Sequence, residues 1–298
     1  MNRSENDAFS RCHPAVGFAF FLGAIGLGAM ILHPAYIVVS GLCAVTYYCL
    51  LRGAKGLKMV ALSVPVFLFL TFANPLVNHD GQRVLGHVFG RPYTFEALVY
   101  GMVIAGMLIA MLLWAGCYNA VMTSDKFIWL FGRIIPALSL LLSMALRFVP
   151  EFTRRLRAVH DARRTLAAGD DRRAFRRVRE ALAAFSILVT WSLESAIETA
   201  DSMRARGYGL RGRSAFSIYR FARWDAFALA WIAFCGVLIV VGWAAGLFDW
   251  RYFPSTSFYR FASPLSALFP LTYLALCLTP VCIDLLEDRK WNSLRSKI

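Results

Sequence analysis

Charged residues are scarce in this chain and absent from its longest apolar run. Only 17% of the 298 residues are Asp, Glu, Lys or Arg, whereas a typical soluble domain carries about 25%. No charged residue occurs from Pro14 to Leu51, a stretch long enough for two helices of ~20 residues across a ~30 Å hydrocarbon core. The composition excludes an ordinary soluble domain and indicates an integral membrane protein.

Several motifs that carry chemistry are also missing. No Gly-x-x-x-x-Gly-Lys-Ser/Thr loop occurs, so the chain is not expected to hydrolyse ATP itself. The seven cysteines form no CxxC pair, and the five histidines lack the spacing of metal ligands. We therefore expect no catalytic residue, no metal site and no cofactor.

Hydropathy predicts an all-α, polytopic fold with about six membrane-spanning helices. The interiors of these spans carry no acid or base, which argues against a self-sufficient ion-coupled transporter. Function is therefore expected in the segment between the spans. The expected spans are 15–32, 34–51, 58–77, 95–121, 225–248 and 264–285.

The positions of the arginines predict which segments of the chain face the cytoplasm. Lys plus Arg is 32 and Asp plus Glu is 18, so the net charge is 32 − 18 = +14. Eleven arginines lie between Arg147 and Glu180, and the positive-inside rule puts them in the cytoplasm. The apolar stretches 127–146 and 182–200 are then interfacial or cytoplasmic, and both termini are cytoplasmic.

In such a protein the basic excess indicates contact with anionic lipid or an acidic partner, not nucleic acid. The expected organisation is membrane helices over 1–121, a cytoplasmic or interfacial segment over 122–224, and membrane helices with a basic tail over 225–298.

Two amphipathic helices are predicted in the central segment. The first is expected to start near Pro150, a favourable first-turn residue, and to stop at Gly169. The second is expected from Asp170-Asp171 to Arg206, and to stop at Gly207, which accepts a left-handed cap. Its apolar face, expected to pack on other helices or on a partner, comprises Val189, Leu193, Ala196, Ala200 and Met203.

Each predicted helix carries arginine near its end, and two interpretations are open. A cation near a helix C-terminus is favourable by ~0.3–1 kcal/mol, which is ordinary capping. Alternatively, an arginine at a helix tip can enter a groove on another protein and pair with a carboxylate there.

The segment that ends the second helix closely resembles a signature of the T component of energy-coupling-factor (ECF) transporters. The resembling residues run from Ala196 to Gly209 (AIETADSMRARGYG) and on through Ser217. Asn74-Pro75-Leu76, Asn78-His79-Asp80-Gly81 and Arg147-Phe148-Val149-Pro150 also resemble this family. The resemblance covers most of the chain from about 70 to 220.

The resemblance implies a non-catalytic membrane scaffold. T components join two cytoplasmic ABC-type ATPases to a substrate-binding membrane protein, the S component, for import of vitamins or transition-metal ions. Arginines in Ala-Arg-Gly motifs dock on the ATPases. Here the second motif is Ala205-Arg206-Gly207, whereas the first is only approximate, with Arg163 or Arg164 in the docking position and the glycine displaced to Gly169.

Two other functions are compatible with parts of the sequence. An intramembrane metal-dependent enzyme could use Glu194, Glu198 and Asp201, which share a helix face, although a solvated polar face explains these acids better. A conventional ABC permease would also dock helices on ATPases, but it would carry its own substrate path.

Overall fold

The computed structural model describes residues 8–88, 91–132, 136–166, 174–210, 219, 221–246, 252–253 and 264–295. The chain forms two compact units, one made of Met1–Phe127 with Tyr219–Ile298 and the other of Ile128–Ile218. Within the described residues, the elements are α1 (Ala8–Arg11), α2 (Pro14–Met30), α3 (Pro34–Arg52), α4 (Ala54–Val77), β1 (Val84–Val88), β2 (Arg91–Thr94), α5 (Phe95–Val121), α6 (Ser124–Gly132), α7 (Pro136–Leu166), α8 (Ala174–Ala205), α9 (Arg223–Ala244) and α10 (Pro264–Arg295).

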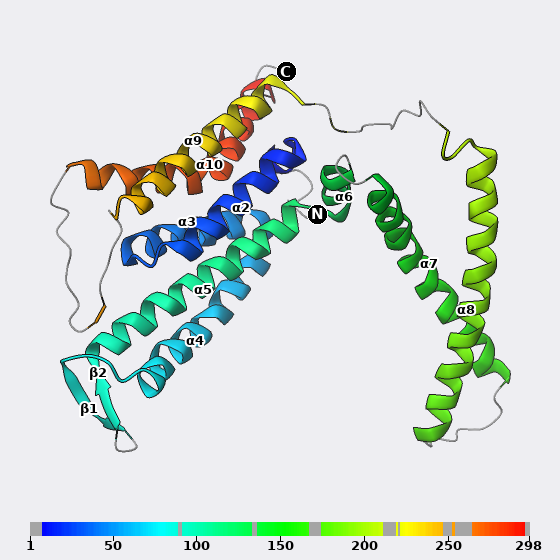
Figure 1. The fold of residues 1–298 in the computed structure, drawn as a ribbon, viewed down its shortest axis with the longest axis horizontal. Helices are drawn as coiled ribbons and strands as arrows, with labels where there is room; N and C mark the ends of the chain where they lie inside the picture. Colours follow the sequence, from blue (N-terminus) through cyan, green and yellow to red (C-terminus); the bar gives the residue numbers. More distant parts are fainter. Residues whose placement is uncertain are drawn as a thin grey trace. The chain divides into compact units, whose positions relative to one another are not determined.

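Helix α5 is central to the first unit. It packs against α2, α3 and α4, while α9 and α10 pack on α2 and α3 (Figure 1). The Trp114 ring on α5 lies 5.5 Å from that of Phe20 on α2, and its indole N–H donates to the Ser40 hydroxyl on α3 over 3.0 Å. All three side chains are buried, so this cluster joins three helices at the middle of the unit.

Proline and histidine start the first two long helices. Pro14 and Pro34 occupy first-turn positions, where the missing N–H is not needed. The Nδ1 atoms of His13 and His33 each accept a hydrogen bond of 3.2 Å from the backbone N–H two residues later. Both histidines therefore cap their helices as hydrogen-bond acceptors.

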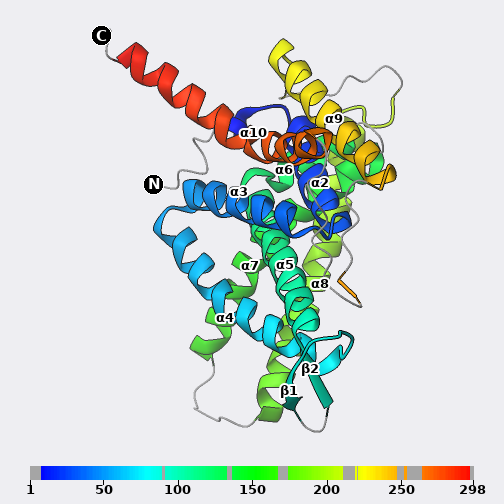
Figure 2. The ribbon, with the colours of Figure 1, turned by 90° about the vertical axis from the view of Figure 1, so that its left-hand side faces the viewer.

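The segment between the expected spans 58–77 and 95–121 contains a short antiparallel hairpin. Strands β1 and β2 pair at the ends of α4 and α5 (Figure 2). The Glu96 carboxylate, 1% exposed at the start of α5, accepts the backbone N–H of Arg83 over 3.1 Å. Further along α5, Gly101 lets α4 approach closely because it has no Cβ. A Cβ at this position would lie 2.6 Å from the Cβ of Asn74 on α4.

The chain is an all-α, multi-pass membrane protein, as predicted. Six described segments are long and apolar enough to cross a membrane, namely Pro34–Arg52, Ala54–Val77, Phe95–Val121, Ala181–Ala205, Arg223–Ala244 and Leu268–Glu287. This set differs from the expected one in two places. Helix α2 is apolar but shorter than the six segments, whereas Ala181–Ala205 of α8 is long and apolar enough to cross. The interfacial placement of 182–200 stays a prediction.

Helices α7 and α8 form the second unit and run in opposite directions (Figure 1). The predicted start of the first helix at Pro150 is wrong, because α7 begins at Pro136 and contains Pro150 in its interior. A proline removes one hydrogen bond to the carbonyl four residues earlier, but it can kink a helix rather than end it. Good helix formers precede Pro150 in the sequence ALSLLLSMAL, so the helix continues through it.

Candidate functional site

The C-terminal end of α8 is closed by its own backbone. The N–H of Tyr208 donates to the carbonyl of Met203 over 3.0 Å, and the N–H of Gly207 donates to that of Arg204 over 3.0 Å. These two bonds, with Gly207 at φ +77°, form a Schellman cap. The predicted stop at Gly207 is thereby confirmed.

Arg206 is the last residue before this cap, and its side chain is exposed. Since the backbone bonds already engage carbonyls at the helix end, the guanidinium is not required as a hydrogen-bonding cap. Among the residues that the structure describes, no ion pair joins Arg206 to an acid, including Glu198 and Asp201 on the same helix. The tip thus presents an exposed cation at a helix end that its own backbone closes.

Two exposed apolar side chains follow the cap, beside Arg206. Tyr208 is 47% exposed and Leu210 is 71% exposed, while Ala205 and Arg204 are exposed in the last turn. An exposed aromatic and an exposed aliphatic side chain beside an arginine are typical of interface residues. Sequence reasoning named the Ala205-Arg206-Gly207 motif but gave Tyr208 and Leu210 no role, although both lie in the quoted signature.

The other predicted tip is only partly described. Arg163 and Arg164 lie in the last turn of α7, which ends at Leu166. Gly169 and Asp170-Asp171 fall outside the described residues. Since α7 and α8 cross at Phe152 and Trp191, the rise of 1.5 Å per residue puts Arg206 about 22 Å from the crossing and Leu166 about 21 Å on the other side. The structure therefore separates the two helix ends instead of bringing them together.

The predicted packing face of α8 is largely open. Leu193 is 64% exposed, Ala196 and Ala200 are exposed, and Met203 is half-buried. A different face of α8, through Ala184, Leu188 and Trp191, contains the buried and half-buried positions.

Glu194, Glu198 and Asp201 are all exposed along α8. In the described part of the chain, no three His, Cys, Asp or Glu side chains gather as a metal site would require. Their spacing follows one helix face over two turns, so their carboxylates do not converge on a single point.

Comparison with known proteins gives one informative relative. No protein-family model matches the chain. Over 172 residues it is 27% identical to the energy-coupling factor transporter transmembrane protein EcfT of Lactobacillus helveticus (strain DPC 4571). The aligned region covers 52% of this chain, and the chain spans 62% of that protein's length. This similarity and the resemblance of the α8 signature point to the same family.

Proposed function

We propose that this chain is the membrane scaffold and coupling subunit of an ECF-type ABC importer. It has no catalytic role itself, and partner subunits bind and hydrolyse ATP. The observation that carries the proposal is the α8 tip, where an exposed Arg206 follows a helix closed by a Schellman cap. Similarity to a protein named as the transmembrane component of such a transporter supports the same conclusion.

The α8 tip would dock in a groove on one cytoplasmic ABC-type ATPase. A guanidinium can pair with a carboxylate through two parallel hydrogen bonds, which fixes orientation as well as position. A rigid tip suits this role because a helix that does not fray transmits displacement along its axis. Tyr208 and Leu210 would contribute apolar contact around the ion pair.

The α7 tip, through Arg163 or Arg164, would dock on the second ATPase. The two helix ends lie up to about 40 Å apart, since each extends about 20 Å from the crossing. A single docking groove could not take both ends, whereas a pair of ATPases offers two. Closure of that pair on ATP would then move both ends of the α7–α8 unit.

The exposed apolar side of α8 would contact the S component or other membrane helices. Leu193, Ala196 and Ala200 combine one large and two small side chains, which permits close helix approach. The cargo would be a vitamin or a transition-metal ion, and specificity would belong to the S component. Both chain termini and the segment 122–224 would face the cytoplasm, because that segment carries most of the arginines.

The test is co-purification of the tagged chain with the host's ABC ATPases, in wild-type and Arg206→Glu forms. Arg157→Glu is the matched control, because Arg157 is exposed on α7 and lies on the other side of the helix crossing from Arg206. We expect the wild type and the control to retain an ATPase pair and Arg206→Glu to lose it. Removing one partner of such a pair typically costs ~2–5 kcal/mol of binding, so the affinity for the ATPase should fall about 30- to 4,000-fold.

Three outcomes would refute the proposal. If neither the wild type nor the variants bind an ATPase, the chain is not a coupling subunit. If all three forms bind equally well, Arg206 is not the docking residue. Uptake that needs no S component would instead indicate a conventional permease.

A further inference from the structure

Trp191 on α8 is held from two sides by side chains of α7. The guanidinium carbon of Arg155 lies 3.1 Å from the centre of the Trp191 ring, a close cation–π contact. The Phe152 ring meets the same indole edge-on, with 5.9 Å between ring centres. Phe152 and Arg155 are three residues apart, so they project from one face of α7. We call Phe152, Arg155 and Trp191 the crossing clasp.

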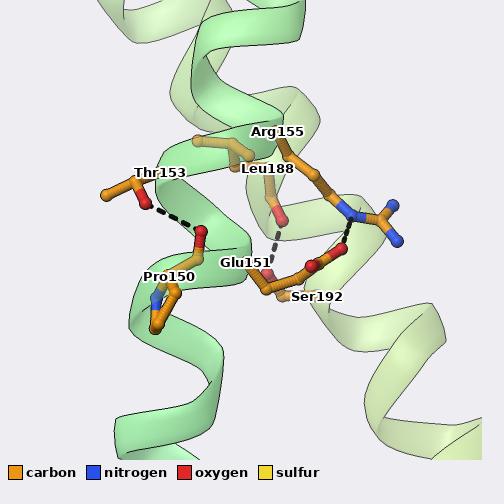
Figure 3. Close-up of polar contacts among 6 residues, drawn as sticks. All are labelled: Pro150, Glu151, Thr153, Arg155, Leu188 and Ser192. Atoms are coloured by element: carbon orange, nitrogen blue, oxygen red, sulfur yellow. Dashed lines mark hydrogen bonds and ion pairs between the residues drawn. The ribbon is translucent and has the colours of Figure 1, made fainter.

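Glu151 orients the arginine of this clasp. Its Oε1 atom lies 2.9 Å from Nε of Arg155, one turn along α7 (Figure 3). This hydrogen bond engages one edge of the planar guanidinium and leaves its flat face for the indole. A guanidinium stacks on an aromatic ring through that face. Glu151 therefore supports a geometry that arginine achieves better than lysine.

The clasp follows directly after a proline in the interior of α7. Pro150 has no N–H to donate to the carbonyl of Leu146, so one helical hydrogen bond is missing there. The Thr153 hydroxyl donates back to the Pro150 carbonyl over 2.7 Å (Figure 3). The part of α7 that leads to Arg163 and Arg164 thus begins at a position that lacks one helical hydrogen bond, which we call the Pro150 joint, and its next turn contacts α8.

We propose that Arg155 is a positioning residue that makes α7 and α8 move as one body. By stacking on Trp191 beyond the Pro150 joint, it fixes the angle at which the two helices cross. A displacement at the Arg206 tip then reaches the α7 tip without being absorbed at Pro150. The inference rests on the proposed function for its consequence in transport, while the clasp itself is a property of this chain alone.

The experiment measures the crossing angle and the coupling separately. Spin labels are placed at Ala158 on α7 and Glu198 on α8, two exposed positions on either side of the clasp. They report the distance between the two helices in the full-length chain. The variants are Arg155→Ala, Arg155→Lys and, as matched control, Arg154→Ala. Arg154 is an exposed neighbour on α7 that lies outside the clasp.

We expect one narrow distance distribution in the wild type and in Arg154→Ala. In Arg155→Ala the distribution broadens, because loss of a cation–π contact raises the unclasped population about 2- to 30-fold. Arg155→Lys is expected to lie between them, since it keeps the charge but not the planar face.

In the reconstituted transporter, Arg155→Ala should still co-purify with the ATPases but import less substrate per ATP hydrolysed. Arg155→Lys should partly restore that ratio. A merely structural role would reduce protein yield without changing the ratio in the protein that remains.

Three results overturn the inference. An unchanged distance distribution in Arg155→Ala rules out the clasp. A broadened distribution with an unchanged import-to-hydrolysis ratio rules out its role in coupling. If the wild type binds no ATPase, the proposed function fails and takes the coupling role with it, while the distances still decide whether the clasp exists.

Discussion

Substituting Gly207 tests whether the rigid end of α8 matters for docking. Gly207 has φ +77°, a left-handed conformation that costs a residue with a Cβ roughly 1–2 kcal/mol. The new Cβ in Gly207→Ala would also lie 3.1 Å from Cδ1 of Leu210, a side-chain end that can shift. The strain therefore acts on the Schellman cap rather than on any core contact.

The apparent affinity for an ATPase should fall with the fraction of chains whose α8 end stays capped. Since 1.4 kcal/mol is tenfold, a strain of 1–2 kcal/mol lowers that affinity by at most about 30-fold, and we expect about 5-fold. Gly207→Asn should lose less, because Asn tolerates the left-handed region. The assay is titration of purified ATPase onto the immobilised chain.

Gly209→Ala is the control for this prediction. Gly209 also has positive φ, at +93°, but it lies beyond the two cap bonds and its Cβ would meet no atom within 4 Å. We expect a small effect on affinity there. Equal affinity of Gly207→Ala and the wild type, or an equal loss in Gly209→Ala, would refute the reasoning that cap geometry positions Arg206.

Two further predictions concern the first unit. Gly101→Ala should lower the free energy of unfolding of the detergent-solubilised chain by ~1–3 kcal/mol, because the added Cβ overlaps Asn74. Gly236→Ala is the control and should not lower it, because a Cβ there meets no atom within 4 Å. Stability should also fall as the pH drops below about 6.5, since burial lowers the pKa of His13 and of His33 and both cap a helix as neutral acceptors. Replacing both with Asn, a cap that does not titrate, should flatten this pH dependence in thermal unfolding, and an unchanged slope would contradict it.

Much of the fold follows from local properties of the sequence. Uncharged runs predicted membrane helices, and Gly207 predicted the end of α8, because only a residue without a Cβ adopts that cap freely. The Ala205-Arg206-Gly207 motif could be placed at a helix tip for the same reason. These features depend on neighbours in the sequence and are therefore visible in it.

Other features depend on competition or on distant contacts. Pro150 predicts a helix start. The helix-forming residues before it nevertheless stabilise a continuous helix by more than the one lost hydrogen bond destabilises it. The apolar run at 182–200 predicted an amphipathic face through Leu193, whereas α7 packs at Trp191. Which face is used depends on the crossing of two helices, and that crossing is set by Arg155 and Phe152, far away in the sequence.

The near absence of a core in the second unit has a consequence for the cell. Among its described side chains, Ala184 alone is buried, while Leu182, Phe185, Leu193 and Ile197 are each more than 60% exposed. A newly made copy therefore carries a large exposed apolar surface on this unit, which lipid or other subunits can cover. We expect surplus copies to be removed by membrane proteases, so that the half-life of the chain in a pulse-chase experiment lengthens when its partners are co-expressed. Balanced synthesis, rather than the sequence of this chain alone, would then set how many copies of the chain a membrane holds.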